Sequence, residues 1–119
     1  MAQPNMISFK LILIFMTTMI LINVMVVAAD KAWCVAKNEA SDQQLLEALN
    51  YACGIGVDCG PIQPNGSCYY PNTIRDHASY AFNTFYQLEK HSLGTCDFSG
   101  TAHVVYTDPS NGNCVYPAN

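Results

Sequence analysis

The polar residues with the most suggestive spacing lie on one predicted helix of this 119-residue chain. One side of that helix, counted at about 100° per residue from Ile74, carries Asp76, Tyr80, Asn83 and Gln87. A tyrosine ring offers an apolar plane to the C–H face of a sugar, and carboxylate and amide groups hydrogen-bond its hydroxyls. On pattern alone, a solvated helix face that includes one tyrosine is the commoner explanation. Sugar binding is therefore one of two hypotheses for this face.

The aromatic residues favour the sugar hypothesis. All seven tyrosines and the single tryptophan lie after residue 30, which is more large amphipathic rings than a small core can hide. Trp33 and Tyr51 lie close to cysteines, so we expect them to pack on disulfides. Tyr70, Tyr80 and Tyr116 are the better candidates for exposure, and a platform of such rings would add many weak contacts along a polysaccharide.

Enzymatic chemistry finds little support in the sequence. A glycosidase needs two carboxylates at a set separation across a deep cleft, and a domain of this size has hardly the mass to build one. Asp76 and Asp97 are the only acids worth testing. Ser79 and His77 stand beside Asp76 on the same helix, where these side chains face different ways and cannot form a hydrolase triad. Neither a CxxC pair nor a close histidine pair indicates a metal site. We therefore expect no catalytic residue, no cofactor and no metal.

A first helix is predicted over residues 42–53. Ser41 and Gln44 have the spacing of a capping box, in which each side chain accepts a backbone N–H of the other residue. Apolar residues then recur at helical spacing until Gly54. The segment that follows, residues 54–71, is rich in Gly, Pro, Asn and Asp, which indicates a loop that needs cross-links to hold it.

A second helix is predicted from an N-cap at Asn72 or Thr73 to about Glu89. Residues 103–107 and 114–116 are predicted as two short strands, because the Asp-Pro-Ser-Asn-Gly segment between them is strong turn chemistry. The core stripe of the second helix is expected to contain Ile74, Ala78, Ala81, Phe82, Phe85 and Leu88. The expected fold class is a small disulfide-rich α+β domain, with two packed helices and a short antiparallel sheet.

The first 29 residues have the pattern of a secretory signal peptide. Lys10 precedes an uncharged, largely apolar run from Leu11 to Ala29. Small side chains at residues 27–29 predict cleavage after Ala29, which leaves residues 30–119 as a secreted, extracellular carbohydrate-binding domain without a stable membrane anchor. An uncleaved anchor helix is the alternative, and it is weakened by the polar residues Thr17, Thr18 and Asn23.

Charge and cysteine content narrow the class of the mature domain. Residues 30–119 hold 4 basic and 9 acidic side chains, a net charge of −5, which argues against a nucleic-acid partner that requires a basic surface. Ninety residues bury too little surface for a comfortable core, so cross-links are expected. An even number of cysteines in an oxidising compartment indicates three disulfides, with 15 pairings open. The six are Cys34, Cys53, Cys59, Cys68, Cys96 and Cys114.

Four blocks of the mature sequence stand out as motifs. They are WCVAK at 33–37, GSCYYPNT at 66–73, HASYAFN at 77–83, and CDF at 96–98 together with DPS at 108–110. These blocks resemble the plant carbohydrate-binding module family 43, and the resemblance covers essentially all of residues 30–119. The family occurs at the C-terminus of some plant 1,3-β-glucanases, alone in small pollen glucan-binding allergens, and in plasmodesmal callose-binding proteins.

The resemblance implies non-catalytic binding of 1,3-β-glucan, such as callose or laminarin-like chains, in the plant cell wall. It implies ligand contacts from the aromatic residues that match Tyr80 and Tyr116, whereas the other candidates rest on the reasoning from residues above; they are Tyr70, Asp76, Asn83 and Gln87. It also implies three disulfide pairs, which are Cys34–Cys96, Cys53–Cys59 and Cys68–Cys114.

Two other functions stay open. One is a secreted, disulfide-rich defence peptide or inhibitor that recognises a protein, although membrane-active defence peptides are usually basic. The other is a monomeric free subunit that brings a separate glucanase to its polysaccharide substrate.

One modification motif completes the sequence. Asn65-Gly66-Ser67 is the chain's only N-glycosylation sequon, and it lies in the Gly- and Pro-rich loop, where a transferase has access to it. Asn65 is therefore a candidate glycosylation site.

Overall fold

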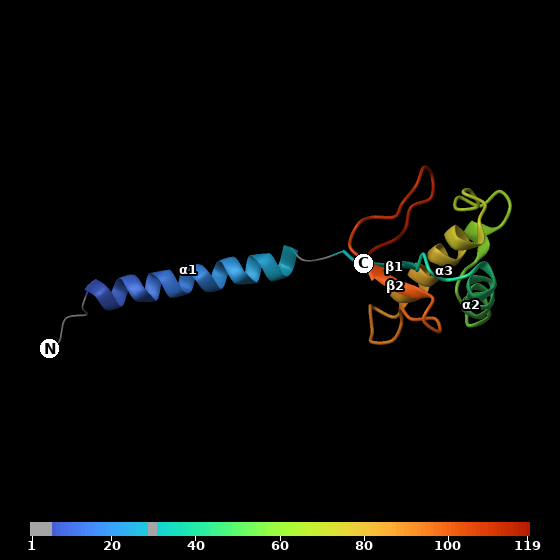
Figure 1. The fold of residues 1–119 in the computed structure, drawn as a ribbon. Coiled ribbons are helices and arrows are strands. Elements are labelled where there is room, and N and C mark those ends of the chain that lie inside the picture. Colours follow the sequence, from blue (N-terminus) through green and yellow to red (C-terminus); the bar gives the residue numbers. More distant parts are fainter. Residues whose placement is uncertain (1–5, 29–30) are drawn as a thin grey trace. The chain divides into compact units, whose positions relative to one another are not determined.

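A computed structural model describes residues 6–28 and 31–119 of the chain (Figure 1). The chain divides into two compact units, Met1–Asp30 and Lys31–Asn119. The first contains helix α1, Met6–Ala28, whose apolar residues are spread around all sides. Among the described residues, no helix combines the length and apolar character needed to cross a membrane. The cleavage site expected after Ala29 lies outside the described residues, so the signal peptide stays a prediction.

The second unit contains the two predicted helices, α2 (Asp42–Gly54) and α3 (Ile74–Leu88), and a short 3-10 helix, η1 (Gly60–Ile62). The N-terminus of α2 carries the predicted capping box. The Gln44 N–H donates to Ser41 Oγ (3.2 Å) and the Ser41 N–H donates to Gln44 Oε1 (2.9 Å). Thr73 caps α3, because its Oγ1 accepts the backbone N–H of Asp76 at 3.0 Å. These caps fix where both helices begin.

The sheet consists of β1 (Trp33–Ala36) and β2 (Ala102–Val105), which pair antiparallel with Trp33 opposite Val105. The predicted strand at 103–107 overlaps β2, but the predicted strand at 114–116 is wrong. Cys114 makes only an isolated bridge to Asn111, because the backbone N–H of Tyr116 donates to Ser110 Oγ and its carbonyl accepts Trp33 Nε1. The strand that pairs with β2 is therefore β1, which precedes α2 and α3 in the sequence.

Helix α3 is the centre of this unit, since it packs against both α2 and β1 (Figure 1). Phe82 is fully buried and its ring stacks on that of Phe98, with ring centroids 4.2 Å apart. Leu88, predicted as a core residue, is 63% exposed. The buried arc of α3 is displaced toward Tyr86 and Gln87, because β1 covers a side of the helix that the sequence had suggested was open.

Three disulfides cross-link the unit, and the structure confirms the small disulfide-rich α+β fold. The pairs are those that the family resemblance implies, Cys34–Cys96, Cys53–Cys59 and Cys68–Cys114.

Candidate functional site

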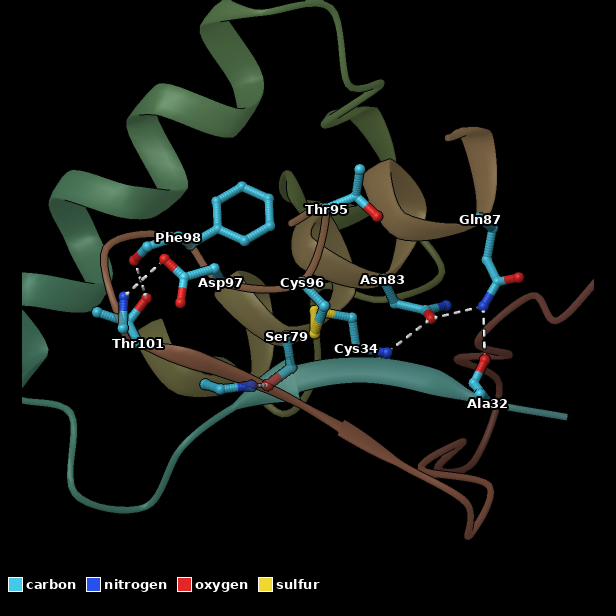
Figure 2. The surroundings of a disulfide bond; sticks show 12 residues. Ala32, Cys34, Ser79, Asn83, Gln87, Thr95, Cys96, Asp97, Phe98 and Thr101 are labelled. Carbon is cyan, nitrogen blue, oxygen red and sulfur yellow. Dashed lines mark hydrogen bonds between the residues drawn. A yellow bond between two sulfur atoms is a disulfide. The ribbon is translucent and has the colours of Figure 1, made fainter. Parts of the chain in front are cut away.

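Three polar side chains of α3, those of Ser79, Asn83 and Gln87, face β1 instead of solvent. Asn83 is fully buried and both Ser79 and Gln87 are buried as well. Their side chains hydrogen-bond the backbone of β1 and of the residue before it, along the edge that β2 does not use (Figure 2). The bonds are Ala36 N–H to Ser79 Oγ (2.9 Å), Cys34 N–H to Asn83 Oδ1 (3.1 Å) and Gln87 Nε2 to the Ala32 carbonyl (2.8 Å).

The remaining polar atoms of the Asn83 and Gln87 side-chain amides hydrogen-bond the C-terminal segment. Asn83 Nδ2 donates to the Pro117 carbonyl at 2.8 Å, and Gln87 Oε1 accepts the Asn119 N–H at 3.0 Å. In the described part of the chain, every buried side-chain nitrogen and oxygen has a hydrogen-bond partner. Asn83 and Gln87 are therefore structural, and burial corrects their prediction as sugar contacts.

Three other predicted residues, two from the first half of α3 and Tyr116 from the C-terminal segment, lie together. The Tyr116 hydroxyl donates to the Asp76 carbonyl at 3.2 Å, and the Tyr80 ring meets the Tyr116 ring edge-on with centroids 5.6 Å apart. Tyr80 and Asp76 are half-buried, whereas Tyr116 is only 7% exposed. Burial raises the pKa of Tyr116 well above that of an ordinary tyrosine, and the neighbouring Asp76 and Tyr80 raise it further. Tyr116 therefore packs against the Tyr80 ring and exposes little surface of its own to a ligand.

Tyr70 is the most exposed of the predicted sugar-contact residues. Its side chain is 75% exposed, and its ring stands edge-on to that of Tyr69 at 4.9 Å. It lines a cavity of about 560 Å³, here called the Tyr70 groove, whose two walls are joined by the Cys68–Cys114 disulfide. The other lining residues are Asn65, Gly66, Ser67, Pro71, Asn111, Gly112 and Asn113.

The Tyr70 groove offers the chemistry that a neutral sugar needs. A side-chain amide both donates and accepts hydrogen bonds, so three asparagines beside an exposed ring match the hydroxyls and the C–H face of a pyranose. Sequence reasoning missed Asn111, which it treated as a turn residue, and Asn113, to which it gave no role. Cross-linking of Cys68 to Cys114 is the signal that could have placed this turn beside Tyr70.

A second cavity of about 630 Å³, here called the Tyr51 groove, lies between α2 and the loop at residues 93–101. Tyr51 is 62% exposed there, so the expectation that it packs on a disulfide is wrong. It lies beside the buried face of α2, which consists of Leu45, Ala48, Leu49 and Ala52. Glu47 and Asp97 also line this groove, and Phe85 and Phe98 contribute apolar surface to it.

Comparison with known proteins assigns the domain. Residues 32–103 match the X8 domain. The chain belongs to the X8 domain family. This family is the carbohydrate-binding module family 43 that the sequence motifs resemble, so that resemblance is confirmed.

Relatives of the X8 domain occur in three kinds of protein. The major pollen allergen Ole e 10 of Olea europaea is 52% identical over 88 residues, which cover 73% of this chain and 72% of the allergen. Plasmodesmata callose-binding protein 2 of Arabidopsis thaliana is 45% identical over 87 residues, covering 73% of this chain and 45% of that protein. A glucan endo-1,3-beta-D-glucosidase of Olea europaea is 51% identical over 87 residues, 73% of this chain but 19% of the enzyme. The glucosidase is matched only in its X8 domain, a carbohydrate-binding module and not a catalytic domain.

Proposed function

We propose that this X8 domain is a secreted protein of the plant cell wall that binds 1,3-β-glucan of the callose type without hydrolysing it. The Tyr70 groove is the observation that carries the proposal, because the exposed Tyr70 and three asparagines line it. The names of the relatives support the choice of polysaccharide, since they include callose-binding proteins and a 1,3-β-glucosidase. The three disulfides fit an oxidising, extracellular compartment.

Binding would extend from the groove along the start of α3. The Tyr69 ring packs against Tyr70 on one side and against His77 on the other, with centroids 5.8 Å apart in the second pair. Tyr80 lies one helical turn beyond His77, and Asp76 is on the same half of the helix. A linear glucan that stacks on Tyr70 and reaches Tyr80 contacts the protein at more than one sugar, and several weak contacts then add up.

The composition of the Tyr70 groove supports binding without hydrolysis. A glycosidase requires two carboxylic acids, one on each side of the scissile bond. The groove is lined by asparagine, glycine, serine, proline and tyrosine, and no carboxylate is among its lining residues. The candidate acid Asp76 is not one of these residues, and it hydrogen-bonds the Thr73 hydroxyl at the N-terminus of α3.

Sedimentation with insoluble 1,3-β-glucan tests the function, with cellulose as the control polymer. We expect the wild-type protein without an oligosaccharide on Asn65 to sediment with 1,3-β-glucan and to remain in solution with cellulose. Failure to sediment with 1,3-β-glucan would reject the proposal and favour a protein ligand.

Two matched variants test the site. Tyr70→Ala and Tyr51→Ala each remove one exposed tyrosine, so neither should unfold the domain. Tyr70→Ala should weaken laminarin binding by about 1–3 kcal/mol, the scale for truncating an interface aromatic, and Tyr51→Ala should leave it unchanged. The reverse result would move the site to the Tyr51 groove.

A further inference from the structure

The N-glycosylation sequon is presented on the rim of the Tyr70 groove. Asn65 is exposed and lines the groove, and its side-chain amide makes no hydrogen bond within the described part of the chain. Its φ of 72° is in the left-handed region, which asparagine tolerates better than most residues. The acceptor nitrogen of the sequon is therefore free to carry a substituent.

Backbone geometry explains Asn65 and Gly66 of the sequon, but it does not explain Ser67. A Cβ on Gly66 would lie 2.2 Å from the Pro61 carbonyl oxygen, so only glycine fits there. The turn at Asn65 likewise explains an asparagine. Ser67 is exposed, and its hydroxyl makes only a 3.9 Å contact with the Cys68 sulfur. A hydroxyl at residue 67 is thus unexplained by packing, whereas the acceptor sequence of N-glycosylation requires it.

The disulfide next to the sequon closes late. Cys68 pairs with Cys114, which follows it by 46 residues. A secreted chain enters the compartment from its N-terminus, so the sequon arrives before Cys114 and is without its cross-link until Cys114 follows.

We infer that Asn65 carries an N-linked oligosaccharide and that this oligosaccharide closes the Tyr70 groove to glucan. The second part rests on the proposed function. Asn65 and Tyr70 line the same cavity, so the first sugars on Asn65 Nδ2 are attached at the groove itself. A group tethered by a short flexible link has an effective local concentration in the millimolar range. The attached sugars therefore compete with glucan for the same ring and amides.

Sequon variants of the full chain, expressed through a plant secretory pathway, test both parts. Ser67→Ala and Asn65→Gln remove the sequon, whereas Ser67→Thr keeps it and serves as the matched control. Intact masses are measured before and after treatment with a peptide N-glycosidase. Because this enzyme converts Asn65 to aspartate, an Asn65→Asp variant is the reference for the treated protein. Laminarin titration then gives the affinity of each form.

We expect wild type and Ser67→Thr to be heavier than Ser67→Ala by the mass of an oligosaccharide, which the glycosidase removes. The glycosylated forms should bind laminarin at least tenfold more weakly than Ser67→Ala, and treated wild type should match Asn65→Asp. Equal masses for wild type and Ser67→Ala would overturn the modification. Equal affinities for the glycosylated and sequon-free forms would overturn the closure. If folded Ser67→Ala, folded Asn65→Gln and treated wild type all fail to bind laminarin, the proposed function and the closure both fail, and the masses still decide the modification.

Discussion

Asn83 accepts the backbone N–H of Cys34 at 3.1 Å, which connects the middle of α3 to the middle of β1. One helical turn away on each side, Ser79 Oγ likewise accepts the Ala36 N–H, and Gln87 Nε2 donates to the Ala32 carbonyl. Four residues of helix rise about 6.0 Å and two residues of strand rise about 6.6 Å. The two repeats therefore match, and a helix replaces the second neighbouring strand that β1 lacks.

The first prediction concerns this match. Asn83→Ala leaves the buried Cys34 N–H without its partner and removes the donor to the carbonyl of Pro117, an exposed residue. We expect the free energy of unfolding to fall by about 1.5–4.5 kcal/mol, because an unsatisfied buried group costs about 1–3 kcal/mol and the lost bond to Pro117 about 0.5–1.5 kcal/mol more. Urea titration measures the loss. Gln43→Ala, which removes an exposed amide from α2, should change stability by less than about 0.5 kcal/mol. A stable Asn83→Ala protein with weakened glucan binding would restore Asn83 as a ligand contact.

The parts of this fold that are predictable from sequence are those set by neighbours in the chain. The bounds of α2 and α3 follow from Ser41 and Thr73, whose caps act over three residues. Pairing of β1 with β2 joins residues about seventy positions apart, and neither strand carries local turn chemistry that specifies the other. Helical periodicity separates an apolar side from a polar side, but it cannot show that the polar side is covered. Asn83 and Gln87 were misassigned for that reason.

The candidate site likewise contains some residues that local sequence predicts and others that only a long-range contact brings to it. Tyr70 and Tyr80 were identified from residue type and position, and the structure leaves both at least partly exposed. The asparagines at 111 and 113 reach the Tyr70 groove only through the Cys68–Cys114 disulfide, whose partners are 46 residues apart. The disulfide pairing is therefore needed to predict that the loop at residues 111–113 forms one wall of the groove.

The second prediction separates the disulfides by the length of chain that each closes. Cys34–Cys96 spans 62 residues, and the chain-entropy model gives it about 4 kcal/mol of stabilisation. Cys53–Cys59 spans 6 residues and should contribute about 2 kcal/mol. Replacing each pair by alanines and comparing urea midpoints measures the difference. A larger loss for the Cys53–Cys59 pair would contradict the model.

The third prediction separates binding from stability on α3. Tyr80→Ala removes a half-buried ring at the proposed end of the glucan surface, so laminarin binding should weaken by about 1–2 kcal/mol while the domain stays folded. Phe82→Ala removes a fully buried ring stacked on Phe98 and should cost about 3–5 kcal/mol of stability. Laminarin titration beside thermal melts distinguishes the two effects. Parental affinity in folded Tyr80→Ala would confine the site to the Tyr70 groove.

The last prediction uses the phenol of Tyr116. Its pKa in the folded protein is raised, chiefly by burial, whereas an unfolded tyrosine titrates near about 10. Above that pH, the unfolded chain releases the proton that the folded chain still holds, which stabilises the unfolded state. The stability linked to this proton is therefore complete below about pH 10 and is lost as the pH rises toward the folded pKa.

Tyr116→Phe removes both the titration and the hydrogen bond to the Asp76 carbonyl. At neutral pH the variant should be less stable than wild type by about 0.5–1.5 kcal/mol, the net value of one hydrogen bond. This gap should shrink between about pH 9 and about pH 11, because only the wild type loses stability through residue 116. Urea titrations at several pH values measure the gap, with Tyr51→Phe as an exposed control that should follow wild type throughout. All six cysteines are in disulfides, so no free thiol starts disulfide exchange in the alkaline samples. A gap that stays constant up to about pH 11 would show that the Tyr116 phenol titrates alike in the folded and unfolded chains.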